Sequence, residues 1–445
     1  MKIGLCVIDM PASLGGGYVF RESLAQAALA SSGRHSVELV RARSQAPKFD
    51  ASSLGGALTQ AVARGGLGSV LQPARLKRAA RRIAGKVMRA GTGRHASGID
   101  PQLRSYVDWA IEQRLTWPNP DTFREFEQDV TSKKYDMLWF NNIEPIHVGI
   151  PYVYNVFDLQ HRLQPWFPEV SDKGQFRLRE GAYAEAVQRA AFVITSSEET
   201  REQVNLFYGV PIDRIRVIHF PTPQPALEAA ASPENPKVSE ADLRARYDIK
   251  GQYLYYPAQF WPHKNHVNLL HGLKALREVH GLDFSMVFSG ADHGNAGFVR
   301  AEARRLGVAD RVHFVGFVSY DEVAALYRHA FAMTYMTFFG PDNLPPLEAF
   351  AFGCPVVLSN IPGIEKLFED AVVPVDHRDG MSIADGVKCL VDDPALRARC
   401  VAKGRAIAYR NSVSNYFGQV QTLFDEFEAV RRCWAMSMGG VEGIR

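Results

Sequence analysis

Glu348 is the residue whose surroundings in the sequence carry the clearest chemistry. It lies in the segment FFGPDNLPPLEAFAFGCPVV, which predicts a strand end, a turn, a helix from about Leu344 to Phe352 and a strand from Pro355 to Ser359. A helix start carries unpaired backbone N–H groups and roughly half a positive charge, so it suits a phosphate group. An ionised carboxylate just over a turn later only accepts hydrogen bonds, so it suits sugar hydroxyls. Together these features predict a pocket for a sugar-nucleotide.

Both halves of the chain alternate apolar strands with helical patterns, which is typical of parallel α/β sheets. At 445 residues the chain is long enough for two domains. We expect strands in the first half at Ile3–Ile8, Met137–Phe140, Tyr152–Val156, Phe192–Thr195 and Val217–His219. In the second half we expect them at Tyr253–Pro257, Phe284–Ser289, Val312–Phe314, Phe331–Tyr335 and Val356–Ser359. The predicted fold class is therefore α/β, with two doubly wound domains and a ligand at the carboxyl ends of the strands.

The segment around Glu348 resembles the retaining GT-B glycosyltransferases of family 4, the group 1 glycosyltransferases. Their signature is a Glu, seven residues, and then Leu-Pro-Pro-Leu-Glu-Ala. It is matched here by Leu344, Pro345, Pro346, Leu347, Glu348 and Ala349, and further on by Gly353, Pro355, Val356 and Val357. The resemblance implies that Glu348 binds the nucleotide ribose. The family's first Glu, which contacts the transferred sugar, is replaced by Gly340, and Asp342 or the backbone after Gly340 is the expected substitute.

The resemblance also implies the GT-B plan, two Rossmann-like domains facing a central cleft. We expect an acceptor-side domain at 1–222 with a basic insertion at about 51–99, and a linker at 223–250. A nucleotide-sugar domain would follow at 251–410, and a helix in 411–445 would cross back to the first domain.

Lys264 follows the first strand of the second domain, a position that suits neutralisation of a diphosphate. In the resembling family an Arg and a Lys five residues apart do this, and Gln259 stands in the place of the Arg. The alternative is a solvated lysine ending a loop. Gly316, Phe317 and Val318 match the family's backbone contacts to the nucleotide base, or simply form a strand end with a Gly bulge.

The segment NVFDLQHRLQPWFPE resembles the family's His-Asp-Leu-x-His segment, in which a His near the reacting sugar aids catalysis. Phe157 replaces the first His, and Asp158 and His161 remain. His161 is the candidate for orienting donor or acceptor, although a lone loop His is more often structural. Gly16 and Gly17, in the glycine loop 15–17, would let backbone approach the acceptor or the diphosphate; a plain flexible turn is the alternative. A dinucleotide fingerprint with Glu38 as the ribose acid fails, because Phe20 replaces the third glycine.

Charge is unevenly distributed in a chain whose net charge is only +3. Positions 51–97 contain no acidic residue and nine Lys or Arg residues, and 72–90 has the pattern of a basic amphipathic helix. The segment 72–94 is thus a candidate for contact with an anionic membrane surface, with a solvated helix as the alternative. Aromatic interleaving is missing, so nucleic acid is not expected as a partner. Five scattered cysteines suit a reducing compartment, and no apolar run approaches the ~20 residues that span a bilayer.

The expected function is that of a retaining, metal-independent glycosyltransferase that uses a UDP- or GDP-sugar donor and needs no further cofactor. No Asp-x-Asp pair is present to hold a divalent metal. The expected acceptor is a saccharide or lipid-linked saccharide, in surface polysaccharide assembly, and the expected location is cytoplasmic or on the inner face of the membrane. The alternatives are a catalytically weak nucleotide-sugar-binding partner subunit and a GT-B epimerase.

Overall fold

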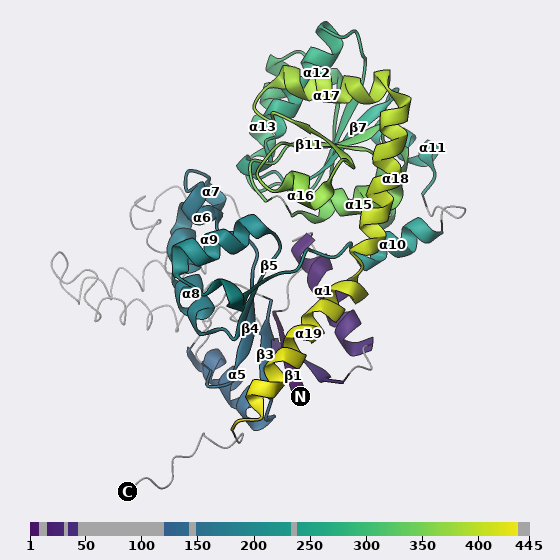
Figure 1. Ribbon diagram of the computed structural model, residues 1–445. Helices are drawn as coiled ribbons and strands as arrows, with labels where there is room; N and C mark the ends of the chain where they lie inside the picture. The colour runs from purple at the N-terminus through teal and green to yellow at the C-terminus, as the bar shows by residue number, and fades with distance from the viewer. Residues whose placement is uncertain are drawn as a thin grey trace, which may run out of the picture. The chain divides into compact units, whose positions relative to one another are not determined.

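The computed structural model describes residues 1–8, 16–30, 34–42, 120–141, 148–232, 238–340 and 342–434 (Figure 1). It forms two compact units, one of Met1–Arg41 with Val130–Arg445 and the other of Ala42–Asp129. The basic segment 72–94 lies outside the described residues, so its contact with a membrane stays a prediction.

The first sheet has six strands in the order β2-β1-β3-β4-β5-β6. Its strands are β1 (Lys2–Ile8), β2 (Ser36–Ala42), β3 (Met137–Phe140), β4 (Tyr152–Val156), β5 (Phe192–Thr195) and β6 (Ile215–Val217). The described helices of this half are α1 (Gly16–Ala30), α5 (Pro120–Ser132), α6 (Gln160–Leu163), α7 (Pro168–Ser171), α8 (Gln175–Arg189) and α9 (Glu198–Tyr208). Every residue of β3 and β4 is buried, because parallel strands are covered on both faces.

The second sheet also has six strands, in the order β12-β11-β10-β7-β8-β9. They are β7 (Tyr253–Pro257), β8 (Ser285–Ser289), β9 (Val312–Gly316), β10 (Ala332–Tyr335), β11 (Val356–Ser359) and β12 (Val372–Val375). Its helices are α12 (His266–Glu278), α13 (Ala296–Arg305), α14 (Tyr320–His329), α15 (Leu344–Phe352), α16 (Ile364–Phe368), α17 (Gly380–Asp392) and α18 (Pro394–Arg410). In Figure 1, α12 and α17 lie together on one face, and α15 and α18 on the other. The predicted fold class is confirmed.

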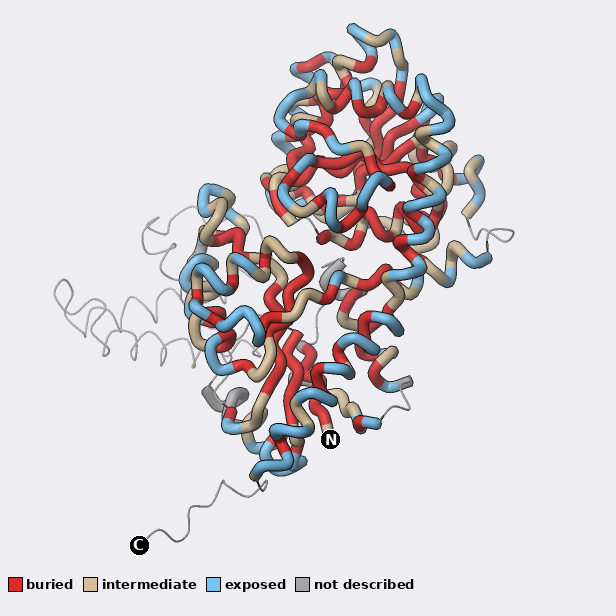
Figure 2. Tube along the Cα trace, in the orientation of Figure 1, coloured by how far each residue is buried: buried red, intermediate tan, exposed pale blue. Residues whose placement is uncertain are grey.

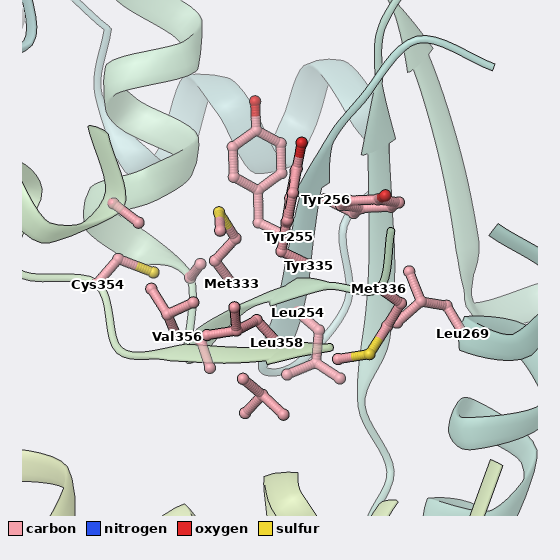
Figure 3. Close-up of a cluster of buried hydrophobic side chains, with 14 of the residues drawn as sticks. Leu254, Tyr255, Tyr256, Leu269, Met333, Tyr335, Met336, Cys354, Val356 and Leu358 are labelled. Carbon is pink, nitrogen blue, oxygen red and sulfur yellow. The ribbon is translucent and has the colours of Figure 1, made fainter. Parts of the chain in front are cut away.

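The core around the second sheet, which lies in the first of the two compact units, contains residues from both faces of the central strands. Figure 3 shows the rings of Tyr255 and Tyr335 on the face of the strands opposite Leu254. Tyr255 is paired with Met333, two residues before Tyr335, so parallel register places both phenols on one face. Figure 2 shows the second sheet as a continuous buried layer beneath partly exposed helices.

Two features of this domain differ from the sequence expectations. The strand β12 was not predicted, because it contains Pro374, which has no backbone N–H to donate. The strand lies at the edge of the sheet, where a proline is tolerated. The expected linker contains α10 (Gln224–Ala231) and α11 (Glu240–Tyr247), and Ala226 and Leu243 are buried in the core of the second domain.

The last helix of the described residues, α19 (Val413–Arg431), packs on the first sheet although it follows the second sheet in sequence. Tyr416 on α19 stacks against Trp139 of β3, with ring centroids 6.4 Å apart. The Asn155 amide donates to the Tyr416 hydroxyl at 3.1 Å and accepts from the Trp139 indole at 2.9 Å. Three buried, hydrogen-bonded side chains therefore join α19 to β3 and β4.

Tyr416→Phe is expected to destabilise the protein by about 1–3 kcal/mol, because the buried Asn155 amide loses its acceptor. Urea unfolding should show a lower midpoint with an unchanged slope. The matched control is Tyr409→Phe, since Tyr409 is half exposed and no hydrogen bond to it is seen in the described part of the chain. Equal midpoints for the two variants would show that these three side chains do not hold α19 in place.

Candidate functional site

The start of α15 offers fewer backbone N–H groups than a typical helix. Asn343 is the N-cap, and two prolines, Pro345 and Pro346, follow Leu344 in the first turn. The first four N–H positions of a helix have no intrahelical partner, and proline has no N–H. In this first turn, Asn343 and Leu344 are therefore the two residues whose backbone N–H can bind a ligand.

Glu348 lies one turn further along α15 and is half-buried. Its Oε2 accepts from the hydroxyl of Tyr327 at 3.2 Å, and this hydroxyl also lies 3.1 Å from the carbonyl oxygen of Pro345. Burial raises the pKa of Glu348 to about 7, against the opposing effect of the Tyr327 and Tyr320 phenols. In the described part of the chain no Lys, Arg or His forms an ion pair with this carboxylate. Glu348 is therefore a partly open acceptor with no cation committed to it.

Lys264 approaches the same helix start from the loop after β7. It ends a short 3-10 turn, Pro262–Lys264, and its carbonyl accepts from the hydroxyl of Tyr256 at 2.6 Å, which fixes the loop to the strand. Its ammonium donates to the hydroxyl of Tyr335 at 2.9 Å. Burial lowers the pKa of Lys264 to about 8, while Asp158 and Glu169 act in the opposite direction.

The hydroxyl of Tyr335 extends the contact from Lys264 to the start of α15. It donates to Oδ1 of Asn343 at 2.9 Å, and the Asn343 amide donates to the carbonyl of Gly340. Lys264, Gly340 and Asn343 were all predicted to bind the sugar-nucleotide donor. They are thus linked, through Tyr335, in one continuous series of hydrogen bonds. Lys264, in the loop after β7, is therefore linked through Tyr335 at the end of β10 to the cap residue of α15, the helix that carries Glu348.

Asp342 points away from this series of hydrogen bonds. Its Oδ2 accepts from the backbone N–H of Phe220 at 2.9 Å, and the side chain is buried. Burial raises the pKa of Asp342 to about 6, and the Phe220 N–H and the nearby His219 act against that rise. Leu344, two residues on, is buried in the cluster that contains Tyr416 of α19. Asp342 and the Leu344 side chain therefore anchor the helix start, and a contact of Asp342 with the transferred sugar stays a prediction.

Asp158 and His161 are held by neighbours within the first half of the chain. The Asp158 carboxylate accepts from the Arg179 guanidinium and the Gln160 N–H, each at 3.0 Å, and these two contacts outweigh burial and lower the pKa of Asp158. The side chain of His161 has no exposed surface, and its Nε2 lies 3.2 Å from Glu180. Burial lowers the pKa of His161, so the ring is neutral near pH 7. This enclosure favours the structural alternative, and the predicted role in orienting a substrate stays a prediction.

Sequence reasoning missed the residues that tie this segment to Lys264. Glu169 accepts from the backbone N–H of His263 at 2.9 Å and also pairs with the His263 ring. The Gln164 amide donates to the carbonyl of Phe338 at 3.1 Å, and the rings of Phe167 and Phe338 lie 5.3 Å apart. These contacts join residues that are far apart in the sequence, so no local pattern signals them.

The other residues that were predicted to contact the sugar-nucleotide lie at the carboxyl ends of β7 and β9 or at the start of α1. Gln259 accepts from the Trp261 indole at 2.9 Å. Gly316 has φ +73°, which favours glycine, and the next residue, Phe317, is 62% exposed. Gly16 and Gly17 begin α1, and the residues before them, 9–15, lie outside the described part. Contacts of these residues, and of Val318, with a nucleotide or diphosphate stay predictions.

Two further findings concern metals and membranes. Within the described ranges, no group of three or more His, Cys, Asp or Glu side chains is arranged to hold a metal ion. No described helix is both long and apolar enough to span a bilayer.

Comparison with known proteins gives the same architecture. Residues 241–407 match the family model "Glycosyl transferases group 1". The O-antigen chain mannosyltransferase B of Escherichia coli is 25% identical over 249 residues, which cover 56% of this chain and 64% of that protein. The O-antigen chain mannosyltransferase RfbU of Salmonella typhimurium is 24% identical over 255 residues, 57% of this chain and 65% of that protein. The chain thus spans just under two thirds of the length of these two relatives.

Solved structures extend the likeness in fold to nearly the whole chain. Anabaena Alr3699/HepE in complex with UDP and glucose has a TM-score of 0.62 at 15% identity, covering 96% of this chain and all of that one. WaaG, a glycosyltransferase involved in lipopolysaccharide biosynthesis, has a TM-score of 0.59 at 15% identity, covering 94% of this chain and 98% of that one. At this identity the likeness shows the fold. The chain therefore has the GT-B fold, and its residues 241–407 match the model of the glycosyl transferases group 1 family.

Proposed function

We propose that the protein is a retaining, metal-independent glycosyltransferase that moves a sugar from a UDP- or GDP-sugar to a saccharide or lipid-linked acceptor. The observation that carries the proposal is the position of the Lys264 ammonium. It forms no ion pair in the described ranges and is linked through Tyr335 to the cap residue of the helix that carries Glu348. Surface polysaccharide assembly is the proposed setting, supported by the names of the two O-antigen relatives.

Each group has a distinct part in the proposed reaction. Lys264 and the N–H groups of Asn343 and Leu344 bind the diphosphate, and Glu348 accepts hydrogen bonds from the ribose hydroxyls. The bond from the sugar C1 to the phosphate oxygen breaks, and the acceptor oxygen bonds to C1 on the same face. The acceptor hydroxyl proton passes to the departing phosphate. Lys264 stabilises the negative charge that grows on the leaving group, because it faces that charge from a partly desolvated position.

A partner subunit that binds a nucleotide sugar without turnover is the second candidate. It is favoured by the replacement of three family residues by Phe157, Gln259 and Gly340. Purified protein incubated with labelled UDP- and GDP-sugars, mannose donors included, separates the two. Nucleotide release that depends on a lipid-linked acceptor supports the transferase, and donor binding without release supports the subunit.

Lys264→Met should weaken donor binding about tenfold or more, because a charge-assisted hydrogen bond contributes roughly 1.5–3 kcal/mol. Isothermal titration calorimetry with the donor that the wild-type protein binds measures this loss. Lys274→Met is the matched control, since Lys274 lies on α12 and pairs with Glu278 on the surface. If Lys264→Met binds the donor as tightly as Lys274→Met does, Lys264 does not hold the diphosphate.

Donor affinity should have a maximum between about pH 7 and 8. Above about pH 7 Glu348 is ionised and accepts charge-assisted hydrogen bonds from the ribose, and above about pH 8 Lys264 loses its charge. The diphosphate of a nucleotide sugar does not titrate in this range, so the two limbs report the protein.

The Glu348→Gln variant isolates the lower limb of this profile. We expect its donor affinity to be weaker at pH 8 and independent of pH between 6 and 7.5, because the amide does not titrate. Glu278→Gln, at the exposed end of α12, should keep the wild-type profile. A rise in affinity between pH 6 and 7.5 that persists in Glu348→Gln would rule out Glu348 as its source.

A further inference from the structure

Asn343 occupies an N-cap position but does not cap the helix with its side chain. An N-cap side chain accepts from the backbone N–H of the second or third helical residue. Here those residues are Pro345 and Pro346, which have no N–H. The Asn343 amide is therefore available for other bonds, and it uses them to contact Tyr335 and Gly340.

Tyr335 joins the ammonium of Lys264 to this amide through one oxygen atom. Its hydroxyl accepts from Lys264 at 2.9 Å and donates its single proton to Asn343 Oδ1 at 2.9 Å. A phenol has one proton to donate, so the direction of both bonds is fixed. Tyr335 is buried at the end of β10, and its ring lies against Tyr256, which holds the Lys264 carbonyl. Both ends of Lys264 are thus fixed by phenols on adjacent strands.

A neutral partner is the important feature of this arrangement. A desolvated lysine is usually paired with a carboxylate, which would cancel its charge and repel a phosphate. The two carboxylates that act on Lys264 from a distance have other partners: Asp158 pairs with Arg179, and Glu169 pairs with His263. The phenol positions the ammonium without neutralising it, and among the described residues it is the one hydrogen-bond partner of the three ammonium N–H groups.

The same series of hydrogen bonds, from Lys264 through Tyr335 and Asn343 to Gly340, explains why position 340 holds glycine. Gly340 has φ +81°, and a Cβ there would lie 2.9 Å from Nδ2 and 3.4 Å from Oδ1 of Asn343. The Asn343 amide is held from both ends, so it cannot move aside without losing its bonds to Tyr335 and Gly340. A side chain at 340 is therefore incompatible with the series of hydrogen bonds from Lys264 to Gly340.

We propose that Tyr335 is a positioning residue for the donor diphosphate: its hydroxyl fixes the Lys264 ammonium relative to the start of α15, so that two adjacent phosphate groups are bound from two sides. This proposal rests on the proposed function. In it Tyr335 touches no substrate, and acts through Lys264 and Asn343.

Tyr335→Phe keeps the ring and removes only the hydroxyl. Its dissociation constant for the donor sugar-nucleotide should rise about tenfold, as expected for the loss of one hydrogen bond that orders a charged group. The high-pH limb of the binding profile should also move to lower pH, because Lys264 loses an acceptor that favours its charged form. A purely structural role would not move that limb.

Tyr253→Phe is the matched control. Tyr253 is also a fully buried strand tyrosine in this sheet, and its hydroxyl donates to the Leu326 carbonyl at 2.8 Å. It begins β7 and so lies at the amino ends of the strands, away from Lys264. This variant should match the wild type in donor affinity and pH profile, whatever its effect on stability.

Two further variants change Asn343 and Gly340, at the end of the hydrogen-bond series that is remote from Lys264. Asn343→Ala removes both amide bonds and should weaken donor binding by a similar factor. Gly340→Glu restores the acidic residue of the resembling family, yet it should weaken binding as well, because its Cβ displaces Asn343. Tighter donor binding in Gly340→Glu would contradict the proposal.

The outcomes distinguish a failure of the positioning role of Tyr335 from a failure of the proposed function. Wild-type affinity and an unmoved high-pH limb in Tyr335→Phe overturn the positioning role and leave the proposed function standing. If Tyr335→Phe does not fold, Asn343→Ala decides, and its unchanged affinity overturns the role. If the wild-type protein binds no UDP- or GDP-sugar, the proposed function itself fails.

Discussion

A partly desolvated lysine that keeps its charge is the constraint on which the rest of this site depends. Removing an ammonium from water is costly, and it lowers the pKa of Lys264 to about 8. The protein does not offset this with a nearby carboxylate. Instead, the Tyr335 phenol accepts a hydrogen bond from the ammonium, and two more distant acidic residues favour its charged form. The arrangement is suited to an anionic ligand, because such a ligand would neutralise the positive charge of the Lys264 ammonium.

The second domain holds this lysine through elements that are themselves tied to the first. Glu169 binds the residue before Lys264, and Asp342 binds Phe220 just ahead of the helix start. The Leu344 side chain is buried with Tyr416 of α19, which in turn packs on β3. The position of the helix start therefore depends on segments from both halves of the chain. Changes in the first half can reach the proposed donor site through these contacts.

Local patterns predicted the elements near the site well. The helix 344–352 was expected with both of its ends, since the prolines, the apolar run and Gly353 mark a helix start and stop. Lys264 and Glu348 were singled out because their residue types and their places after strands suit a diphosphate and a ribose. The structure brings both to one helix start, although it does not test their contacts with a ligand.

Side-chain direction and long-range pairing could not be predicted in the same way. The bond from the Phe220 N–H to the Asp342 carboxylate was not foreseen, because no pattern relates positions 122 residues apart. Tyr335 was read only as part of an apolar strand, because sequence alone does not show where its hydroxyl ends. The number of free N–H groups at the start of α15, in contrast, can be read from the sequence. Two prolines stand there, and proline has no backbone N–H.

A crystal structure with a bound UDP- or GDP-sugar tests the central claim most directly. We expect the diphosphate within hydrogen-bond distance of both the Lys264 ammonium and the Leu344 N–H, with the ribose hydroxyls bound to Glu348. A diphosphate seated away from Lys264, or a ribose with no contact to Glu348, would contradict it.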